Sequence, residues 1–351
     1  MSHFSTLGYT PNPLIEKYQQ AFVDKLQNIW RVQIDEDVPS SDFLLFPDVH
    51  GLLLASQRPG ELQRKYFCDS LRIMKQTYDV DGFLYKKEEV IPGTNILLTL
   101  DFINPDVDKS THPDHKKQNV GISFGSIDPE EWRRLFSNAF EIVKKVSPGF
   151  MDEIDHIIKK IIPFGISSGS HNSGSYSDVI GHLLMSYPVD MPNPELALLE
   201  AILHEYNHNK LNLIMQTETL ILSNKQEIYY SPYRPDARHI HGIYLGIHAL
   251  AGAFWVILHA HVSGIISLSQ AWQEKSVLYV LKNGLSLQVL DKYGEFSPLG
   301  KDILEEMRRV HMECLGFIKQ AQISPSIIKR AKEALISHFN QVESNYPDLR
   351  S

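Results

Sequence analysis

The sequence predicts an α+β fold that is predominantly α-helical and contains a small β-sheet. Three observations support this fold class. Long segments have apolar residues at helical spacing, strand-like segments occur only before residue 190, and Asp-Pro and Asn-Pro pairs mark helix starts. Two long apolar helices in the C-terminal half carry histidines, so we expect them to form a metal cradle.

The N-terminal part is expected to be mixed. Asp128 and Pro129 have the residue types of an N-cap and a first helical position. A strand is predicted over 95–103, followed by a polar loop over 104–117 that contains two prolines. Helices are predicted over 13–32, 61–76, 129–146 and 151–162.

The C-terminal part begins with a Ser/Gly-rich stretch at 167–177 and a predicted strand at 179–187. Asn193 and Pro194 then mark the start of a helix. A second apolar helix is expected over 241–263. The rest, 268–346, is predicted to be mostly helical, with turns at Asn283-Gly284 and around Pro298. No linker separates 1–165 from 166–351, so we expect a single domain over 1–351 whose second part is catalytic.

The composition excludes several classes of protein. Hydrophobic residues make up 43% and charged residues 22%, which is ordinary for a globular chain. A net charge of -8 argues against nucleic acid as a partner. The two cysteines exclude a disulfide framework and a Cys-rich zinc site. The N-terminus does not resemble a signal peptide, and the apolar run 245–257 is short and contains glycine, so we expect a cytoplasmic protein without a membrane span.

The strongest functional signal is the H-E-x-x-H motif formed by His204, Glu205 and His208. Residues four apart share one face of a helix, so both imidazoles can reach one metal ion. The flanking residues are apolar, which predicts a buried helix. Buried histidines and a buried glutamate need a metal or a hydrogen-bond network. The motif predicts a metal site but fits both a zinc peptidase and an iron oxygenase.

The H-E-x-x-H motif does not identify the third metal ligand. A metzincin is excluded because Leu211 and Ile214 stand where that pattern requires Gly and His. A thermolysin-like site would use a glutamate, and the nearest are Glu218 and Glu227. The second apolar helix carries His241 and His248 two turns apart on one face. Each is either a ligand or a core histidine.

The segment 229–238, between the two histidine helices, carries Arg234 and Arg238. Arginines near a metal site commonly bind a carboxylate through two parallel hydrogen bonds. The alternative is a surface turn with solvated arginines. Both interpretations are compatible with a proline-containing loop.

Taken in order, these blocks resemble the HExxH-type peptide β-hydroxylases, which are 2-oxoglutarate-dependent enzymes associated with ribosomal peptide maturation. The resemblance covers roughly 165–258. Its blocks are the Ser-rich segment, Ile180-Gly-His-Leu-Leu-Met-Ser, His204-Glu-Tyr-Asn-His-Asn-Lys-Leu, Tyr230-Ser-Pro-Tyr-Arg-Pro-Asp-Ala-Arg and His241-Gly-Ile-Tyr-Leu-Gly-Ile-His-Ala-Leu.

The resemblance implies Fe(II) held by His204, His208 and a third histidine, with His248 the first choice and His241 the second. Arg234 matches the family's arginine and would hold the distal carboxylate of 2-oxoglutarate, with Arg238 as the alternate. The chain departs from the common pattern where Tyr233 replaces Trp and Ala237 replaces Pro. Neither change removes a ligand, but both put the shape of the pocket in question.

We therefore expect an Fe(II)/2-oxoglutarate-dependent dioxygenase that uses O2 to hydroxylate the β-carbon of a residue in a peptide or protein, with a ribosomal precursor peptide as partner. In this reading Glu205 orients ligands or water around the metal. The alternative is an HExxH zinc metallopeptidase, in which Zn(II) replaces iron and Glu205 is the general base. A third reading is a protein that keeps a metal only for structure.

Overall fold

The computed structural model describes residues 13–34, 37–57, 61–81, 90–98, 129–166, 172–188, 191 and 193–347. The chain forms two units. One, the sheet unit, contains Leu14–Phe140 and Glu153–Thr217, and the other, the helical unit, contains Met1–Pro13, Glu141–Asp152 and Glu218–Ser351. The last boundary between the two units falls after Thr217. This is later in the chain than residue 165, where the sequence analysis separates the N-terminal part from the catalytic part. A single domain over 1–351 stays a prediction.

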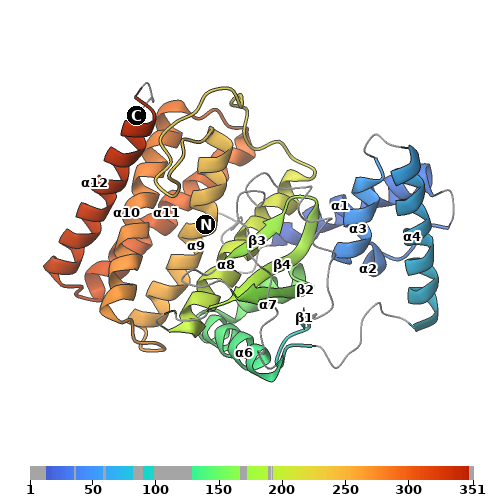
Figure 1. Ribbon diagram of the computed structural model, residues 1–351, viewed down its shortest axis with the longest axis horizontal. Coiled ribbons are helices and arrows are strands. Elements are labelled where there is room, and N and C mark those ends of the chain that lie inside the picture. The colour runs from blue at the N-terminus through green and yellow to red at the C-terminus, as the bar shows by residue number, and fades with distance from the viewer. Residues whose placement is uncertain are drawn as a thin grey trace. The chain divides into compact units, whose positions relative to one another are not determined.

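Helices make up most of the described residues, and the strands within these ranges form one small mixed sheet, which confirms the predicted α+β class (Figure 1). Helices α6 and α7 each have residues in both units. The helices up to residue 217 are α1 (Pro13–Gln33), α2 (Ser41–Leu44), α3 (Pro47–Ala55), α4 (Glu61–Asp81), α6 (Pro129–Val146), α7 (Pro148–Ile157) and α8 (Pro194–Met215).

Helix α1 follows the apolar spacing that predicts it. Ile15, Tyr18, Phe22, Leu26 and Trp30 are all buried, because residues three or four apart lie on one face of a helix. The predictions for α4 and α6 are also confirmed, with α4 extending to Asp81. The proposed N-cap Asp128 lies outside the described residues.

The sheet has the strand order β1-β2-β4-β3. Strand β2 (Lys160–Ile166) runs parallel to β1 (Leu97–Leu98) and to β4 (Val179–Tyr187), and β3 (Ser173–Tyr176) pairs antiparallel with β4. Helix α8 contacts β3 and β4, and α3 contacts β4. The predicted strand over 179–187 is thus confirmed as an inner strand next to the histidine helix. Of the predicted strand 95–103, only β1 is strand within the described part, and 99–117 lies outside it.

The predicted helix over 151–162 is wrong beyond residue 157. Helix α7 ends at Ile157, and Lys160 begins β2. Ile161 and Ile162 are buried in the sheet, and a strand buried on both faces has a continuous apolar run that resembles a buried helix in sequence. Pro163 is the residue that distinguishes the two, because a helix interior does not tolerate proline.

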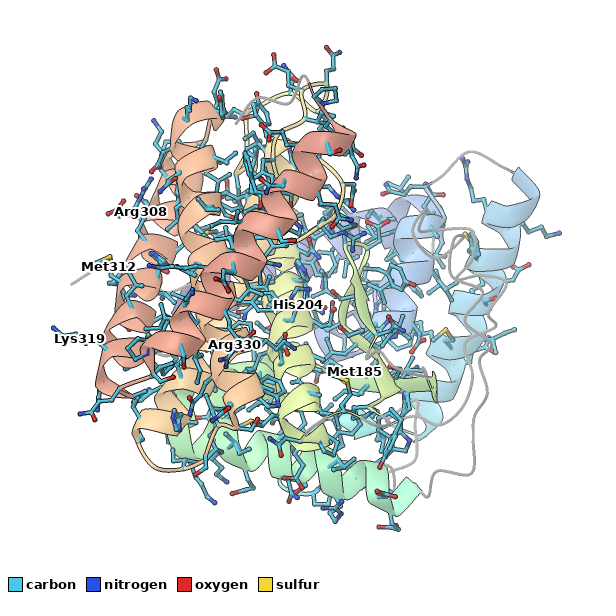
Figure 2. All side chains as sticks on the ribbon, turned by 60° about the vertical axis from the view of Figure 1, so that its left-hand side comes forward. Met185, His204, Arg308, Met312, Lys319 and Arg330 are labelled. Carbon is cyan, nitrogen blue, oxygen red and sulfur yellow. The ribbon has the colours of Figure 1, made fainter. Side chains whose placement is uncertain are left out.

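The helical unit contains α9 (Ile240–Val262), α10 (Gln270–Tyr293), α11 (Pro298–Gln320) and α12 (Pro325–Asn345). Helix α9 contacts α10 and α11, and α10 contacts α12. Serine side chains cap the last three helices, at Ser269, Ser297 and Ser324. Helix α11 turns Met312 and Lys319 toward solvent (Figure 2).

Helix α9 is long and apolar enough to cross a membrane by length and composition alone. However, 83% of its most apolar window is buried inside the structure. Core helices of globular units have the same composition, so this is weak evidence for a membrane span.

The predicted turn at Asn283-Gly284 is wrong, because both residues lie inside α10. Asn283 is fully buried. A Cβ atom on Gly284 would lie 3.3 Å from the His311 ring of α11, so glycine permits the close approach of these two helices. The predicted break around Pro298 is confirmed as the start of α11.

Two buried histidines make the stability of the sheet unit depend on pH. His50 on α3 and His182 on β4 are 1% and 3% exposed. Burial lowers the pKa of each to about 4, and for His182 the nearby Lys160 and His50 add to this while Asp48 opposes it. His50 Nδ1 donates to the Leu44 carbonyl at 3.2 Å, which fits a neutral imidazole.

We expect the metal-free protein to lose stability as the pH falls from about 6.5 to about 4. The unfolded chain takes up these protons near pH 6.5, whereas the folded chain resists until about pH 4. Each histidine therefore contributes stability on the order of 3 kcal/mol above pH 6.5 that is lost toward pH 4. Urea unfolding between pH 7.5 and 4.5 measures this loss. His182→Gln should make the pH dependence shallower, and parallel curves for both proteins would contradict the assignment.

Candidate metal centre

His204 and His208 lie one turn apart on α8, and their side chains meet. The two Nε2 atoms are 3.0 Å apart, and the rings are nearly perpendicular at 85°. Two imidazole nitrogens bound to one ion at about 2.0–2.1 Å lie roughly 2.8–3.4 Å apart, depending on the angle at the ion. The pair therefore fits two ligands of a single metal.

The protonation of His208 also suits a ligand. Its burial, helped by the neighbouring His204 and opposed by Glu205, lowers its pKa to about 4. A neutral imidazole has the free nitrogen lone pair that a metal needs. The same contact is also short enough for a hydrogen bond between one protonated and one unprotonated ring nitrogen.

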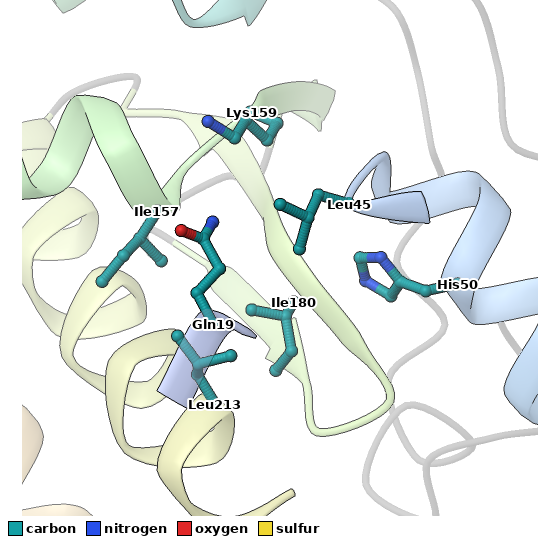
Figure 3. A pocket seen from close by; sticks show the side chains of 7 residues that line it. All are labelled: Gln19, Leu45, His50, Ile157, Lys159, Ile180 and Leu213. Atoms are coloured by element: carbon teal, nitrogen blue, oxygen red, sulfur yellow. The ribbon is translucent and has the colours of Figure 1, made fainter. Parts of the chain in front are cut away.

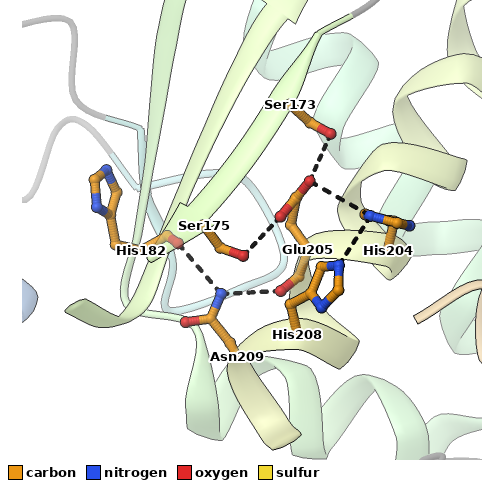
Figure 4. Close-up of polar contacts among 7 residues, drawn as sticks. All are labelled: Ser173, Ser175, His182, His204, Glu205, His208 and Asn209. Atoms are coloured by element: carbon orange, nitrogen blue, oxygen red, sulfur yellow. Dashed lines mark hydrogen bonds and ion pairs between the residues drawn. The ribbon is translucent and has the colours of Figure 1, made fainter. Parts of the chain in front are cut away.

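Glu205, the central residue of the motif, is held by two serines from β3. It is 4% exposed. Ser173 Oγ donates to Oε1 at 2.7 Å and Ser175 Oγ donates to Oε2 at 2.6 Å (Figure 4). Oε1 is also 3.9 Å from His204 Nε2. Each carboxylate oxygen therefore has a fixed serine partner.

The pKa of Glu205 is lowered despite its burial. Burial alone would raise this pKa, but His204, His208 and the two serine hydroxyls outweigh it. The carboxylate is therefore ionised at neutral pH. A buried anion in this position fixes the side chains of α8 relative to β3.

Asn209, next to the motif, fastens α8 to β4. Its amide nitrogen donates to the carbonyls of Glu205 and His182, and its oxygen accepts the Gly181 N–H at 2.6 Å (Figure 4). Gly181 has φ +86°, and a Cβ there would lie 2.7 Å from the Ile157 carbonyl oxygen. Only glycine fits this position without strain.

A buried ionic cluster holds α8 to α7. Glu153 Oε1 accepts from Lys210 Nζ and from the hydroxyl of Tyr206, and all three side chains are buried. Removing one partner of this pair would leave an uncompensated buried charge and would strongly destabilise the protein. The histidine pair thus sits on a helix that is anchored on two sides.

A small pocket lies elsewhere in the sheet unit. It is lined by His50, Lys159 and Gln19 together with apolar residues of the helices and β4 (Figure 3). Its volume is about 10 Å³, room for about one water molecule. It is too small for a peptide or a cosubstrate.

Neither possible third histidine belongs to the sheet unit. Among the described residues, no group of three or more His, Cys, Asp or Glu side chains has the arrangement of a metal site. His248 is fully buried on α9, and His241 is half-buried in the first turn of that helix. Both lie in the helical unit, so their roles as first and second choice stay predictions.

Arg234 and Arg238 share one acidic partner. The segment from Tyr229 to Arg238 is closed by two backbone hydrogen bonds between its ends, of 2.7 and 2.9 Å. Asp236 lies 2.7 Å from Arg238 Nε and 3.5 Å from Arg234 Nε. The Arg234 side chain is 49% exposed and that of Arg238 is 27% exposed. Binding of a carboxylate by either arginine stays a prediction.

The sequence analysis did not predict that Ser173, Ser175 and Asn209 are parts of the site. The alternation of Ser173 and Ser175 in the Ser/Gly-rich stretch was an available signal, since residues two apart on a strand share a face. Asn193 does precede α8 as predicted, but its backbone is left-handed and its side chain makes no capping hydrogen bond.

Comparisons of this chain with protein-family models and with curated proteins give no match. The fold and the site define an α+β protein with a helix-borne histidine pair and an ionised, serine-bound glutamate.

Proposed function

We propose that this protein is an Fe(II)/2-oxoglutarate-dependent dioxygenase that hydroxylates the β-carbon of a residue in a ribosomally made peptide or protein. The observation that carries the proposal is the pair of serine hydroxyls on Glu205. A zinc peptidase needs this glutamate to take a proton from a water molecule on the metal. An oxygenase needs it only to orient neighbouring groups, which is what a carboxylate with two fixed partners does.

The available carboxylates also favour the oxygenase over the peptidase. A thermolysin-like peptidase would take a third ligand, a glutamate, from a following helix. Glu218 and Glu227 are both exposed and lie in the connection between α8 and α9, and Glu227 accepts the Tyr229 hydroxyl at 2.5 Å. Neither is placed on a helix.

In the proposed centre, His204 and His208 of α8 and His248 of α9 hold Fe(II), with His241 as the alternate third ligand. Together with 2-oxoglutarate and O2, bound iron supplies an oxidant able to break an unactivated C–H bond. The reaction consumes the peptide C–H group, 2-oxoglutarate and O2 and yields the peptide alcohol, succinate and CO2. Glu205 keeps the histidine-bearing face of α8 in position throughout.

Arg234 is the proposed partner of the distal carboxylate of 2-oxoglutarate, and Arg238 is the alternate. Asp236 lies 2.7 Å from Arg238 Nε and 3.5 Å from Arg234 Nε. We further propose a ribosomal precursor peptide as partner, neither nucleic acid nor a membrane, and a cytoplasmic location. The net charge of -8 supports the exclusion of nucleic acid.

Arg234→Ala should raise the concentration of 2-oxoglutarate needed for half-maximal succinate release by about ten- to a hundredfold, because a charge-assisted contact contributes about 1.5–3 kcal/mol. Its iron content should be unchanged. Arg309→Ala, which removes a half-exposed arginine from α11, is the matched control. Both variants are assayed by succinate release with and without O2 and peptide, together with mass spectrometry of the peptide.

Glu205→Gln separates the two enzyme classes. A peptidase would lose turnover because its base is gone. The oxygenase should keep part of its activity, since glutamine can still contact one of the serines. A mass gain of one oxygen in the peptide supports the hydroxylase, and peptide cleavage that needs neither O2 nor 2-oxoglutarate would overturn it.

A further inference from the structure

A second polar cluster lies in the helical unit, on α10 and beside the segment that carries Arg234. Lys282 and Ser286 are one turn apart on α10, and Asn283 lies between them. Tyr233 donates its hydroxyl to Asn283 Oδ1 at 2.5 Å. Burial raises the pKa of Tyr233, and a hydrogen bond from the Ser286 hydroxyl opposes this.

One polar atom in this cluster is buried without a partner. Asn283 and Ser286 are fully buried. The Ser286 hydroxyl has Tyr233 as a partner, but Asn283 Nδ2 has no hydrogen-bond partner within the described part of the chain. An unsatisfied buried polar group costs about 1–3 kcal/mol, so the Asn283 amide calls for an explanation.

Lys282 adds a buried cation to the same side. It is 9% exposed, and burial lowers its pKa. Its ammonium lies 5.1 Å from the centre of the Tyr279 ring, a contact that offsets part of its desolvation. Over the described ranges, no acidic side chain lies within ion-pair distance of Lys282.

A histidine of α12, His338, also lies near this cluster. The Tyr230 hydroxyl is 2.9 Å from His338 Nδ1 on α12. Burial lowers the pKa of His338, the nearby charge of Lys282 lowers it further, and a hydrogen bond with the Arg234 backbone opposes both. His338 therefore borders both Lys282 and the Arg234 segment.

We propose that Lys282, Asn283 and Ser286 form a subsite that binds the carboxylate of an organic acid. The Lys282 ammonium and the Asn283 amide N–H are donors suited to the two acceptor oxygens of a carboxylate, and the Ser286 hydroxyl can rotate from Tyr233 toward the same ligand. A carboxylate would satisfy the unpartnered Asn283 amide and neutralise the buried cation. If the acid is 2-oxoglutarate, the subsite rests on the proposed function and lies beside Arg234; an acidic side chain of a peptide is the other source.

The test measures binding to metal-free protein by calorimetry, so it does not depend on turnover. The probes are glutarate, with dimethyl glutarate as its neutral control, and N-acetylglutamate methylamide, with the corresponding glutamine compound as control. Lys282→Met should weaken binding of the preferred acid by about ten- to a hundredfold, and Ser286→Ala by about two- to tenfold. Lys282→Arg should retain most of the affinity.

Lys292→Met is the matched control, because Lys292 is an exposed lysine on the same helix. Lys282→Met should fold with a Tm at least equal to that of the wild type, since it removes an unpaired buried charge. Preference for glutarate identifies a small diacid, and preference for the glutamate compound identifies a peptide side chain. The subsite is overturned if the wild type binds neither acid, or if Lys282→Met and Lys292→Met bind equally well. Glutarate binding without any succinate-forming activity would leave the subsite standing and count against the dioxygenase.

Discussion

His204→Ala and His208→Ala should each lower the affinity of the protein for Fe(II) by more than about a hundredfold. Loss of a group that merely orients a ligand costs about ten- to a hundredfold in metal affinity, so loss of a ligand itself should cost more. The 3.0 Å separation of the two Nε2 atoms is the geometric basis, since two nitrogens at this distance can bind the same ion. Metal analysis of protein purified and reconstituted under anaerobic conditions measures the effect.

The exposed His156 of the sheet unit provides a matched control, and His156→Ala should keep the full metal content. Urea unfolding of each variant without metal shows whether the change acts on the metal or on the fold. Stoichiometric iron or zinc in either His204→Ala or His208→Ala would show that the rings only hydrogen bond to one another. The proposed oxygenase and the alternative peptidase would then both lose their centre.

Much of the fold is encoded in local patterns and could be predicted. Apolar spacing identifies α1, and an apolar run between turn signals identifies β4. The errors fall where packing overrides the local pattern. Lys160–Ile166 becomes a strand because neighbouring strands flank it, and Asn283-Gly284 stays helical because α11 packs closely against Gly284. Those partners are far away in the sequence, so no local window contains them.

The candidate site also has features that the sequence predicts and features that it does not. The spacing of His204 and His208 alone places both on one face of a helix, and the structure brings them together. The partners of Glu205 come from β3, about thirty residues earlier, and become visible only when the strand pairs with β4. Asp236 shows the converse, because its contacts with Arg234 and Arg238 are local in the sequence.

His248→Ala should remove bound metal nearly as completely as His208→Ala, whereas His241→Ala should keep the metal and lose some activity. His248 is fully buried on an apolar helix, where an imidazole needs a strong partner, and His241 is half-buried in the first turn. Iron content, measured beside the stability of the metal-free protein, separates a ligand from a core histidine.

Leu250→Ala on the same helix is the control for damage to the core. Leu250 is buried, so its truncation should lower the free energy of unfolding by about 2–5 kcal/mol and leave metal binding intact. A core role for His248 would give His248→Ala this same pattern. If His241→Ala instead lost the metal, the third ligand would move by two turns and the class of enzyme would stand. If both histidine variants kept full metal, a carboxylate such as Glu227 would become the favoured third ligand. The zinc peptidase would then be better supported than the oxygenase.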